Sequence, residues 1–122
     1  MEVNEITEKI IGGAIEVHRN LGPGLLESVY EKALIIEFEA INLKFENQKK
    51  LNVKYKNRDI GEYRIDFLIE NSVVLELKSV ERHDPVFEAQ LLSYMKLGSY
   101  KVGLLINFNS KLLKDGIKRM IL

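Results

Sequence analysis

Three charged side chains stand where two neighbouring strands would bring them together: Asp66 in one strand pattern, and Glu76 and Lys78 in the next. Alternate residues of a strand point to opposite faces, so Glu76 and Lys78 share a face while Leu77 points to the core. Two carboxylates and one ammonium group on the same side of a sheet suit a hard divalent cation and a phosphate ester. These residues therefore predict a site for metal-assisted phosphodiester chemistry.

The hydrophobic pattern favours the register that brings the two acids together. Residues 63–69 and 73–78 both alternate apolar and polar side chains, and a shift of one residue would expose half of the core face. The odd loop that this register needs is Glu70-Asn71-Ser72, where asparagine tolerates left-handed backbone. The expected cross-strand pairs are Phe67–Leu75, Ile65–Leu77, Ile69–Val73, Asp66–Glu76 and Arg64–Lys78.

The composition bounds the class of protein. A chain of 122 residues with 46% hydrophobic and 30% charged residues predicts one domain over residues 1–122. The absence of cysteine excludes disulfides, thiol catalysis and thiolate zinc sites. No apolar run reaches the roughly 20 residues of a membrane span, and the N-terminus lacks a signal pattern. We therefore expect a cytoplasmic protein without a membrane partner.

Charge is unevenly distributed although the net charge is zero. Residues 44–59 carry 6 basic and 2 acidic groups, residues 60–90 carry 3 and 7, and residues 91–122 carry 6 and 1. An acidic centre between basic segments fits a metal site whose edges steer phosphate groups. The alternative is scattered, solvated charge, since sums over segments need not become surface patches.

Helical periodicity marks two segments near the N-terminus. Residues 4–20 have Asn4 as the expected N-cap, and Gly22-Pro23-Gly24 breaks the helix. Residues 26–40 form the second expected helix. The apolar residues expected to face the core are Ile6, Ile10, Ala14, Val17 and Leu21 in the first helix and Val29, Ala33, Ile36 and Phe38 in the second.

Further strands and a third helix follow. Residues 50–55 alternate as a strand with Leu51, Val53 and Tyr55 inward. Asp84-Pro85 supplies an N-cap and a first-turn proline for a helix that is expected to end near Gly98.

The C-terminal part completes the expected topology. Residues 102–108 match a buried strand, while residues 110–122 fit a turn followed by either a helix or an edge strand. The order α-α-β-β-β-α-β predicts an α/β fold with a mixed central sheet flanked by helices.

Several segments resemble a known family. Gly24-Leu25-Leu26-Glu27-Ser28-Val29-Tyr30 is similar to the signature of the GxxExxY protein family, and residues 15–24, 61–67 and 104–108 resemble it too. This family belongs to the PD-(D/E)XK phosphodiesterase superfamily, with Ile65 here in place of the name-giving proline. The resemblance implies a restriction-endonuclease-like α-β-β-β-α-β core, which agrees with the order of elements above.

The candidate metal site follows from the residues and the resemblance together. Mg²⁺ needs only one or two carboxylates because it keeps several waters, so Asp66 and Glu76 suffice, with the Leu77 carbonyl as a further ligand. Mn²⁺ is an alternative ion. Lys78 would stabilise developing charge or orient the attacking water. The alternative is a solvated face on which these charges merely neutralise one another.

Three further residues carry over from the resemblance. Glu27 corresponds to a helix glutamate that often completes the metal site, although an acid also favours a helix N-terminus without any function. Gln90 and Tyr94 resemble the Q-x-x-x-Y element of recombination exonucleases, where the pair positions substrate. Their alternative is an amphipathic helix whose tyrosine packs in the core. For His18 we expect a structural role.

Two functions remain open. The first is a Mg²⁺-dependent nuclease that hydrolyses phosphodiester bonds of nucleic acid, with DNA the expected substrate. The second is a nuclease fold that binds nucleic acid or assembles without turnover, which zero net charge and small size favour. A homodimer is also open, since a small core often needs a partner to span a duplex.

Overall fold

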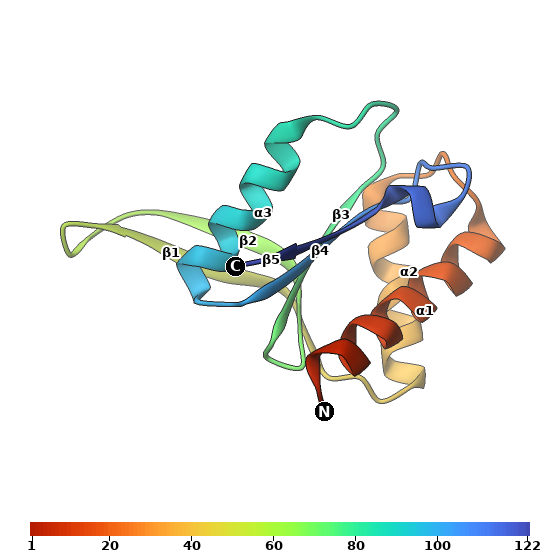
Figure 1. The fold of residues 1–122 in the computed structure, drawn as a ribbon, viewed down its shortest axis with the longest axis horizontal. Helices are drawn as coiled ribbons and strands as arrows, with labels where there is room; N and C mark the ends of the chain where they lie inside the picture. The colour runs from red at the N-terminus through yellow and green to blue at the C-terminus, as the bar shows by residue number, and fades with distance from the viewer.

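The computed structural model describes residues 1–122 and contains three α-helices and five strands (Figure 1). None of the helices is both long and apolar enough to cross a bilayer. The last segment, left open by the sequence, is a 3₁₀ turn followed by an edge strand. In chain order, the elements are α1 (Val3–Leu21), α2 (Glu27–Ala40), β1 (Phe45–Tyr55), β2 (Arg58–Ile69), β3 (Val73–Lys78), α3 (Pro85–Gly98), β4 (Val102–Asn107), η1 (Leu113–Gly116) and β5 (Ile117–Ile121).

The strands form one mixed sheet in the order β1-β2-β3-β4-β5. Three neighbouring pairs are antiparallel, while β3 and β4 are parallel and are joined through α3. A parallel pair needs such a crossover, because a short hairpin cannot reverse the chain twice. The expected α/β architecture with a mixed sheet is confirmed.

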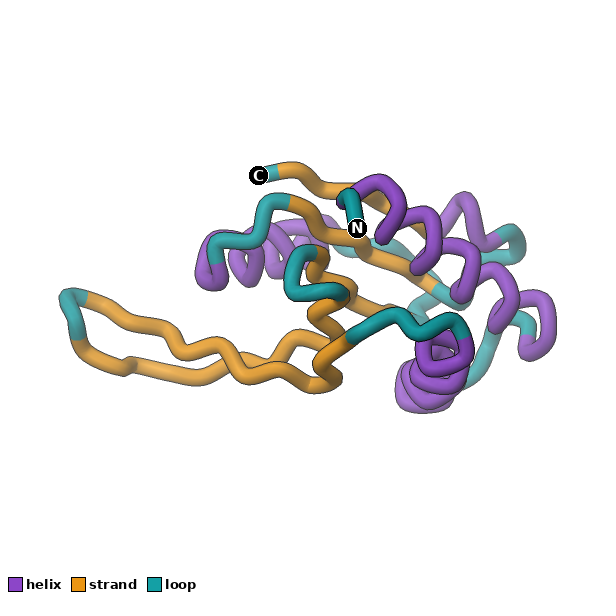
Figure 2. Tube along the Cα trace, turned by 90° about the horizontal axis from the view of Figure 1, so that it is seen from below, coloured by secondary structure: helices purple, strands orange, loops and turns teal.

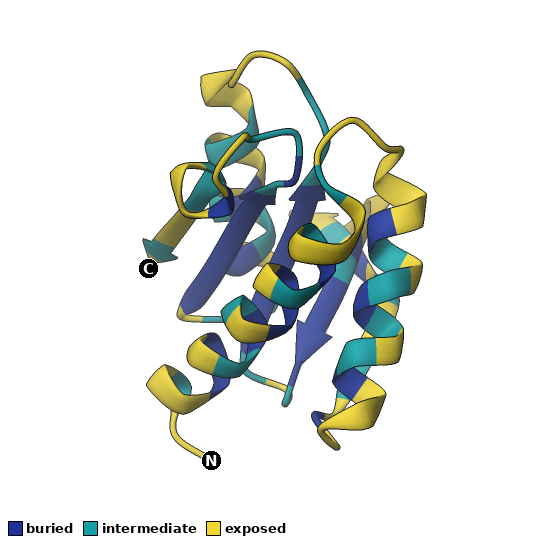
Figure 3. Ribbon diagram, turned by 90° about the vertical axis from the view of Figure 1, so that its right-hand side faces the viewer, coloured by how far each residue is buried: buried dark blue, intermediate teal, exposed yellow.

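Helices cover both faces of the sheet and create two hydrophobic cores. The larger core lies between the sheet and the helices α1 and α2, as Figure 3 shows, and includes Tyr30, Phe38, Phe67 and Phe108. The smaller core lies under α3 and includes Leu91 and Met95. Gly103 permits the close approach of α3, since a Cβ atom there would lie 2.7 Å from the sulfur of Met95.

The helix positions are confirmed, but some details of the helices differ from expectation. Helix α1 buries the expected stripe except for Leu21, and its N-cap is Glu2 instead of Asn4. Helix α2 buries Tyr30, Leu34 and Phe38, whereas Val29 and Ile36 are exposed. The error has a simple cause: α2 carries apolar residues on several faces, so periodicity does not single out the buried one. Asp84 caps α3 as expected, with its Oδ1 accepting from the Val86 N–H at 2.9 Å.

Strands β1 and β2 are longer than predicted and form a hairpin that projects from the rest of the molecule (Figure 2). Strand β1 begins at Phe45 instead of Lys50, and Tyr55, expected to point inward, is exposed. The turn consists of Lys56 and Asn57, both with positive φ. A two-residue turn of this kind matches the right-handed twist of a hairpin.

The predicted register of β2 and β3 is right at the loop and wrong beyond it. Phe67 pairs with Leu75 and Ile69 pairs with Val73, around the three-residue loop that starts at Glu70. The ladder does not continue toward Arg64, which instead lies opposite Lys50 of β1. The predicted pairs Ile65–Leu77, Asp66–Glu76 and Arg64–Lys78 are therefore not formed.

The ladder between β2 and β3 ends because the side chains of β2 stop alternating regularly between the two faces of the sheet near Asp66. Ile65 packs in the core under α3 with Leu68, whereas Phe67 packs in the core under α1 and α2. Strict alternation would place Ile65 and Phe67 on one face. The strands β2 and β3 consequently separate at Asp66, and this separation is the fork at which the candidate site lies.

Candidate active site

The two predicted acids meet at the fork through hydrogen bonds to the backbone. The Asp66 N–H donates to Oε2 of Glu76 at 2.7 Å, and the Leu77 N–H donates to Oδ2 of Asp66 at 2.8 Å. Each carboxylate thus accepts from an N–H group that a continuous ladder would give to a strand carbonyl. Hydrogen bonds from backbone N–H groups to the two carboxylates replace the backbone pairing of β2 and β3 at this point. The fold therefore holds Asp66 and Glu76 close to one another.

The second oxygen of each carboxylate is less engaged. Asp66 Oδ1 accepts one long hydrogen bond of 3.3 Å from Gln48, and Glu76 Oε1 accepts none although it is not sealed from solvent. No third acid or histidine joins the pair to form a ready cage of three ligands. Two anchored carboxylates with free oxygens suit Mg²⁺, which takes few protein ligands and retains water. The residues present therefore fit such an ion.

Burial and mutual repulsion make both acids weak. Burial, followed by the neighbouring charge of Asp66, raises the pKa of Glu76 from 4.5 to about 8. Burial also raises the pKa of Asp66, opposed by its hydrogen bond from Leu77. Lys78 lowers the pKa of Glu76 but is outweighed. A bound cation would offset the repulsion and favour the ionised pair.

Helix α2 and a distortion of β1 add further polar groups, of which sequence reasoning predicted Glu27 and missed Gln48 and Glu31. Gln48 has a positive φ of 53°, and its side-chain amide contacts both Asp66 and Glu31. The Glu27 carboxylate forms no three-ligand cluster with the two acids of the fork. Its Oε2 accepts one long hydrogen bond, of 3.4 Å, from the Ser79 N–H. These groups line a cavity of about 230 Å³ together with Ser28 and Leu77. Glu31 follows Glu27 by four residues, a spacing that signals one helix face.

The Gly24–Tyr30 segment has a clear structural basis. The Tyr30 hydroxyl donates to the Gly22 carbonyl at 2.5 Å and accepts from the Leu25 N–H at 3.1 Å. Its ring stacks on Phe108 with the centroids 4.4 Å apart. Gly24 adopts φ 99°, which favours glycine. The tyrosine therefore holds the turn that starts α2 and orients Glu27 at the cavity.

We expect Tyr30→Phe to destabilise the protein by about 1–3 kcal/mol, because two backbone groups of the turn lose their partner. Urea unfolding would measure the change in free energy. Tyr100→Phe is the control, since the Tyr100 side chain is part-buried, less so than Tyr30, and its hydroxyl makes no hydrogen bond. Equal stability of the Tyr30→Phe variant and the wild type would contradict this role.

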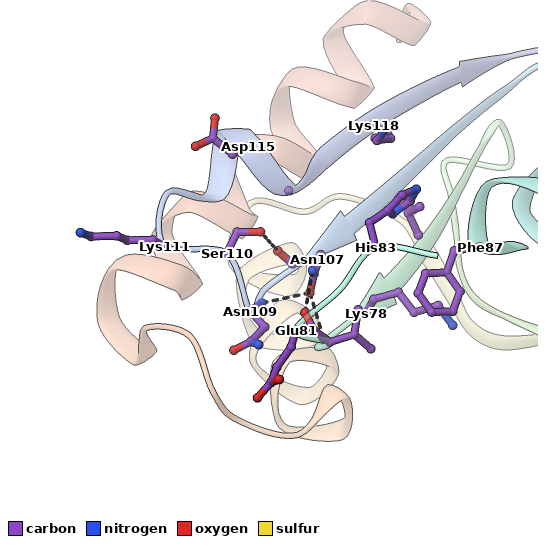
Figure 4. A pocket seen from close by; sticks show the side chains of 13 residues that line it. Lys78, Glu81, His83, Phe87, Asn107, Asn109, Ser110, Lys111, Asp115 and Lys118 are labelled. Carbon is purple, nitrogen blue, oxygen red and sulfur yellow. Dashed lines mark hydrogen bonds between the residues drawn. The ribbon is translucent and has the colours of Figure 1, made fainter. Parts of the chain in front are cut away.

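Lys78 lies at the edge of the site and not in contact with the acids. Its ammonium group is 4.6 Å from the centre of the Phe87 ring and forms no ion pair. In Figure 4 the side chain runs alongside Phe87 at the border of a polar cavity of about 350 Å³. A cation over an aromatic face is held weakly, so the ammonium group is free to engage an anion.

Asn107 holds the loop that follows Lys78. Its side-chain amide exchanges two hydrogen bonds with the backbone of Val80, at 3.0 and 3.1 Å, and its Oδ1 also accepts from the Asn109 N–H (Figure 4). His18 connects α1 to the same region, with Nε2 2.8 Å from the Ser110 carbonyl. This contact agrees with the structural role expected of His18.

Gln90 and Tyr94 lie on the α3 side of the fork. Both line an apolar cavity of about 590 Å³ between α3 and the β1–β2 hairpin. Burial raises the pKa of Tyr94, and the charges of Glu76 and Asp66 add to that effect. Gln90 is exposed and its side chain makes no hydrogen bond to the protein. Tyr94 is therefore near the acids, while Gln90 lies at the rim.

Comparison with known proteins identifies the family. The family model described as the PD-(D/E)XK nuclease superfamily matches residues 4–120. This chain belongs to the PD-(D/E)XK nuclease superfamily. Its mixed sheet with flanking helices is consistent with the restriction-endonuclease-like fold, and nucleases of this superfamily generally use divalent metal ions. The comparisons with curated proteins and with solved structures found no match.

Proposed function

We propose that this PD-(D/E)XK protein is a Mg²⁺-dependent nuclease that hydrolyses phosphodiester bonds of nucleic acid. The observation that carries the proposal is the fork, where the backbone holds Asp66 and Glu76 together, while Glu76 Oε1 accepts no hydrogen bond and Asp66 Oδ1 accepts only a long one from Gln48. Burying two acids side by side destabilises the folded chain, so their arrangement is better explained by a bound cation than by stability.

The protein groups have distinct roles in this proposal. Asp66, Glu76 and the Leu77 carbonyl would hold the ion, which when bound polarises a phosphate oxygen and lowers the pKa of water. Glu27 lies across the 230 Å³ cavity from Asp66 and would hold water or a second ion. Lys78 would leave the Phe87 ring to stabilise negative charge on the phosphate. Gln90 and Tyr94 would position the strand.

Replacing Lys78 by alanine should lower the rate of metal-dependent cleavage by about 10²–10³-fold, the usual effect of removing one charge-stabilising donor. Metal affinity should be nearly unchanged, because Lys78 is not a ligand. The measurement is cleavage of labelled single-stranded and duplex DNA in Mg²⁺ or Mn²⁺, beside calorimetric titration of the metal.

Lys114→Ala is the matched control, since Lys114 is exposed, unpaired and outside the fork. It should cleave like the wild type. Wild-type protein that binds DNA under both metals without cutting it would instead indicate a binding module with a nuclease fold, and the proposed activity would be wrong.

A further inference from the structure

Residues 50–64, which we term the arm, form the projecting part of the β1–β2 hairpin (Figure 2). Within the arm only Leu51 is buried, and most other side chains are exposed. A two-stranded hairpin alone is marginally stable in water, so a ribbon that leaves the core is unexplained by folding. The projecting arm therefore favours a role in binding another molecule.

The arm is positively charged and its cations lack acidic partners. Residues 50–64 contain five basic and two acidic residues, a net charge of +3 in a chain of net charge zero. None of the five forms an ion pair with an acid. Lys50 and Arg64 even lie directly opposite one another across the two strands. Like charges in that position are destabilising, and a polyanion would relieve the repulsion.

The two faces of the arm differ. Val53 and Tyr63 face α3, where they line the apolar cavity. Lys50 and Arg64 occupy the opposite face by alternation, and both are exposed. That open face lies on the same side of the sheet as α2, whose Glu27 contributes to the cavity beside Asp66.

The cation pair also lies at a useful distance from the acids. Arg64 precedes Asp66 by two residues, which is about 7 Å along a strand. Phosphates held by Lys50 and Arg64 would therefore belong to nucleotides close in sequence to the one at the fork.

We propose that the arm binds double-stranded DNA by lying in its major groove, while Lys50 and Arg64 hold the phosphates of the strand that enters the fork. This inference rests on the proposed nuclease function and names its substrate class. A two-stranded ribbon fits the major groove of B-DNA, which is about 12 Å wide and 8.5 Å deep. Residues 52–55 extend about 13 Å at 3.3 Å per residue, enough to reach its floor. The major groove of duplex RNA is too narrow for such a ribbon.

Features of β1 argue against a second copy of the chain as the occupant. Strand β1 is an edge strand, but lysines follow its length at Lys49, Lys50 and Lys54. Its pairing with β2 also shifts between Val53 and Lys54. Edge lysines and bulges both discourage strand-to-strand association.

The test measures DNA binding without cleavage, in EDTA, by fluorescence anisotropy of a short labelled duplex over a series of salt concentrations. The double variant Lys50→Gln/Arg64→Gln should bind at least about tenfold more weakly at low salt. It should also reduce the slope of log affinity against log salt by about 2, one for each lost phosphate contact. Lys101→Gln/Lys114→Gln removes two exposed lysines outside the arm and should bind like the wild type.

The role of the arm can be tested independently of cleavage by comparing nucleic acids, the arm variant with the wild type, and their oligomeric states. Wild type should prefer duplex DNA to single-stranded DNA and to duplex RNA of the same sequence. Equal binding by the arm variant, or a wild-type preference for either other nucleic acid, would overturn the arm's role whether or not the protein cleaves. A wild-type dimer that the variant converts to monomer in sedimentation would also overturn it. A protein that binds duplex through the arm but never cuts would refute only the activity.

Discussion

The Asp66→Asn variant is expected to lose metal-dependent cleavage by about 10³-fold or more. Metal stabilisation of a phosphoryl transition state is worth several kcal/mol, and each 1.4 kcal/mol is a factor of ten in rate. Asparagine keeps the size of Asp66 and can still accept from the Leu77 N–H through its carbonyl oxygen, so the fork should keep its shape. Single-turnover cleavage of labelled DNA with saturating Mg²⁺ would measure the loss.

A matched acid elsewhere separates this effect from a general change of charge. Glu39 is exposed at the end of α2 and far in sequence from the fork residues, so Glu39→Gln should retain the wild-type rate. Circular dichroism should show the same fold for both variants. If Asp66→Asn cleaves as fast as Glu39→Gln, the assignment of Asp66 as a metal ligand is wrong.

The metal-free protein is expected to lose stability as pH rises, and Glu76→Gln should remove most of that loss. The pKa of Glu76 is raised from 4.5 to about 8 by burial and by Asp66, so the folded state disfavours its ionised form. Below pH 4.5 Glu76 is neutral in both the folded and the unfolded chain and does not lower the stability. Between pH 4.5 and about 8 it ionises in the unfolded chain first, so the free energy of unfolding falls. Since one pKa unit corresponds to about 1.4 kcal/mol, the loss should reach a few kcal/mol.

Urea unfolding in EDTA at pH 5 and pH 8 would measure this effect. Glutamine stays neutral and can still accept from the Asp66 N–H, so the variant should be the more stable protein at pH 8 but not at pH 5. Mg²⁺ should raise the stability of the wild type at pH 8 and barely affect the variant. A wild type whose stability is flat between these pH values would contradict the raised pKa and the repulsion behind it.

The expected effects of Asp66→Asn on activity and of Glu76→Gln on stability together distinguish a functional site from a structural one. The acids lower the stability of the empty protein and are expected to be indispensable to its activity. A site kept for stability alone would show the opposite behaviour on neutralisation, with the variant less stable at every pH.

Much of the fold could be predicted because local signals were strong. The hairpin loop at Glu70–Ser72 and the helix start at Asp84-Pro85 follow from turn and capping chemistry. The meeting of Asp66 and Glu76 was expected from a pairing register, and the acids do meet. The route is different, because side chains bonded to backbone N–H groups replace the ladder at that point.

The rest could not be predicted because nothing local marks it. Gln48 has a positive φ without being glycine or asparagine, and β2 changes faces at Asp66 where the alternation looks unbroken. Residues 50–55 of the arm alternate and are predicted as a strand, whereas residues 58–62 of β2 are exposed and have no apolar alternation to reveal one. Glu31 is the exception, because its spacing of four residues from Glu27 is a local signal, although its contact with Gln48 is not. The other features depend on contacts between segments that are distant in the chain.

Locating the metal would test most directly whether Asp66 and Glu76 bind it. A crystal soaked in Mn²⁺ and measured near the manganese absorption edge would show where the ion binds. We expect an anomalous peak at the fork, in contact with Oδ1 of Asp66 and Oε1 of Glu76, and no such peak in crystals of Asp66→Asn. An empty fork in the wild type at saturating Mn²⁺, or an equal peak in the variant, would contradict this assignment.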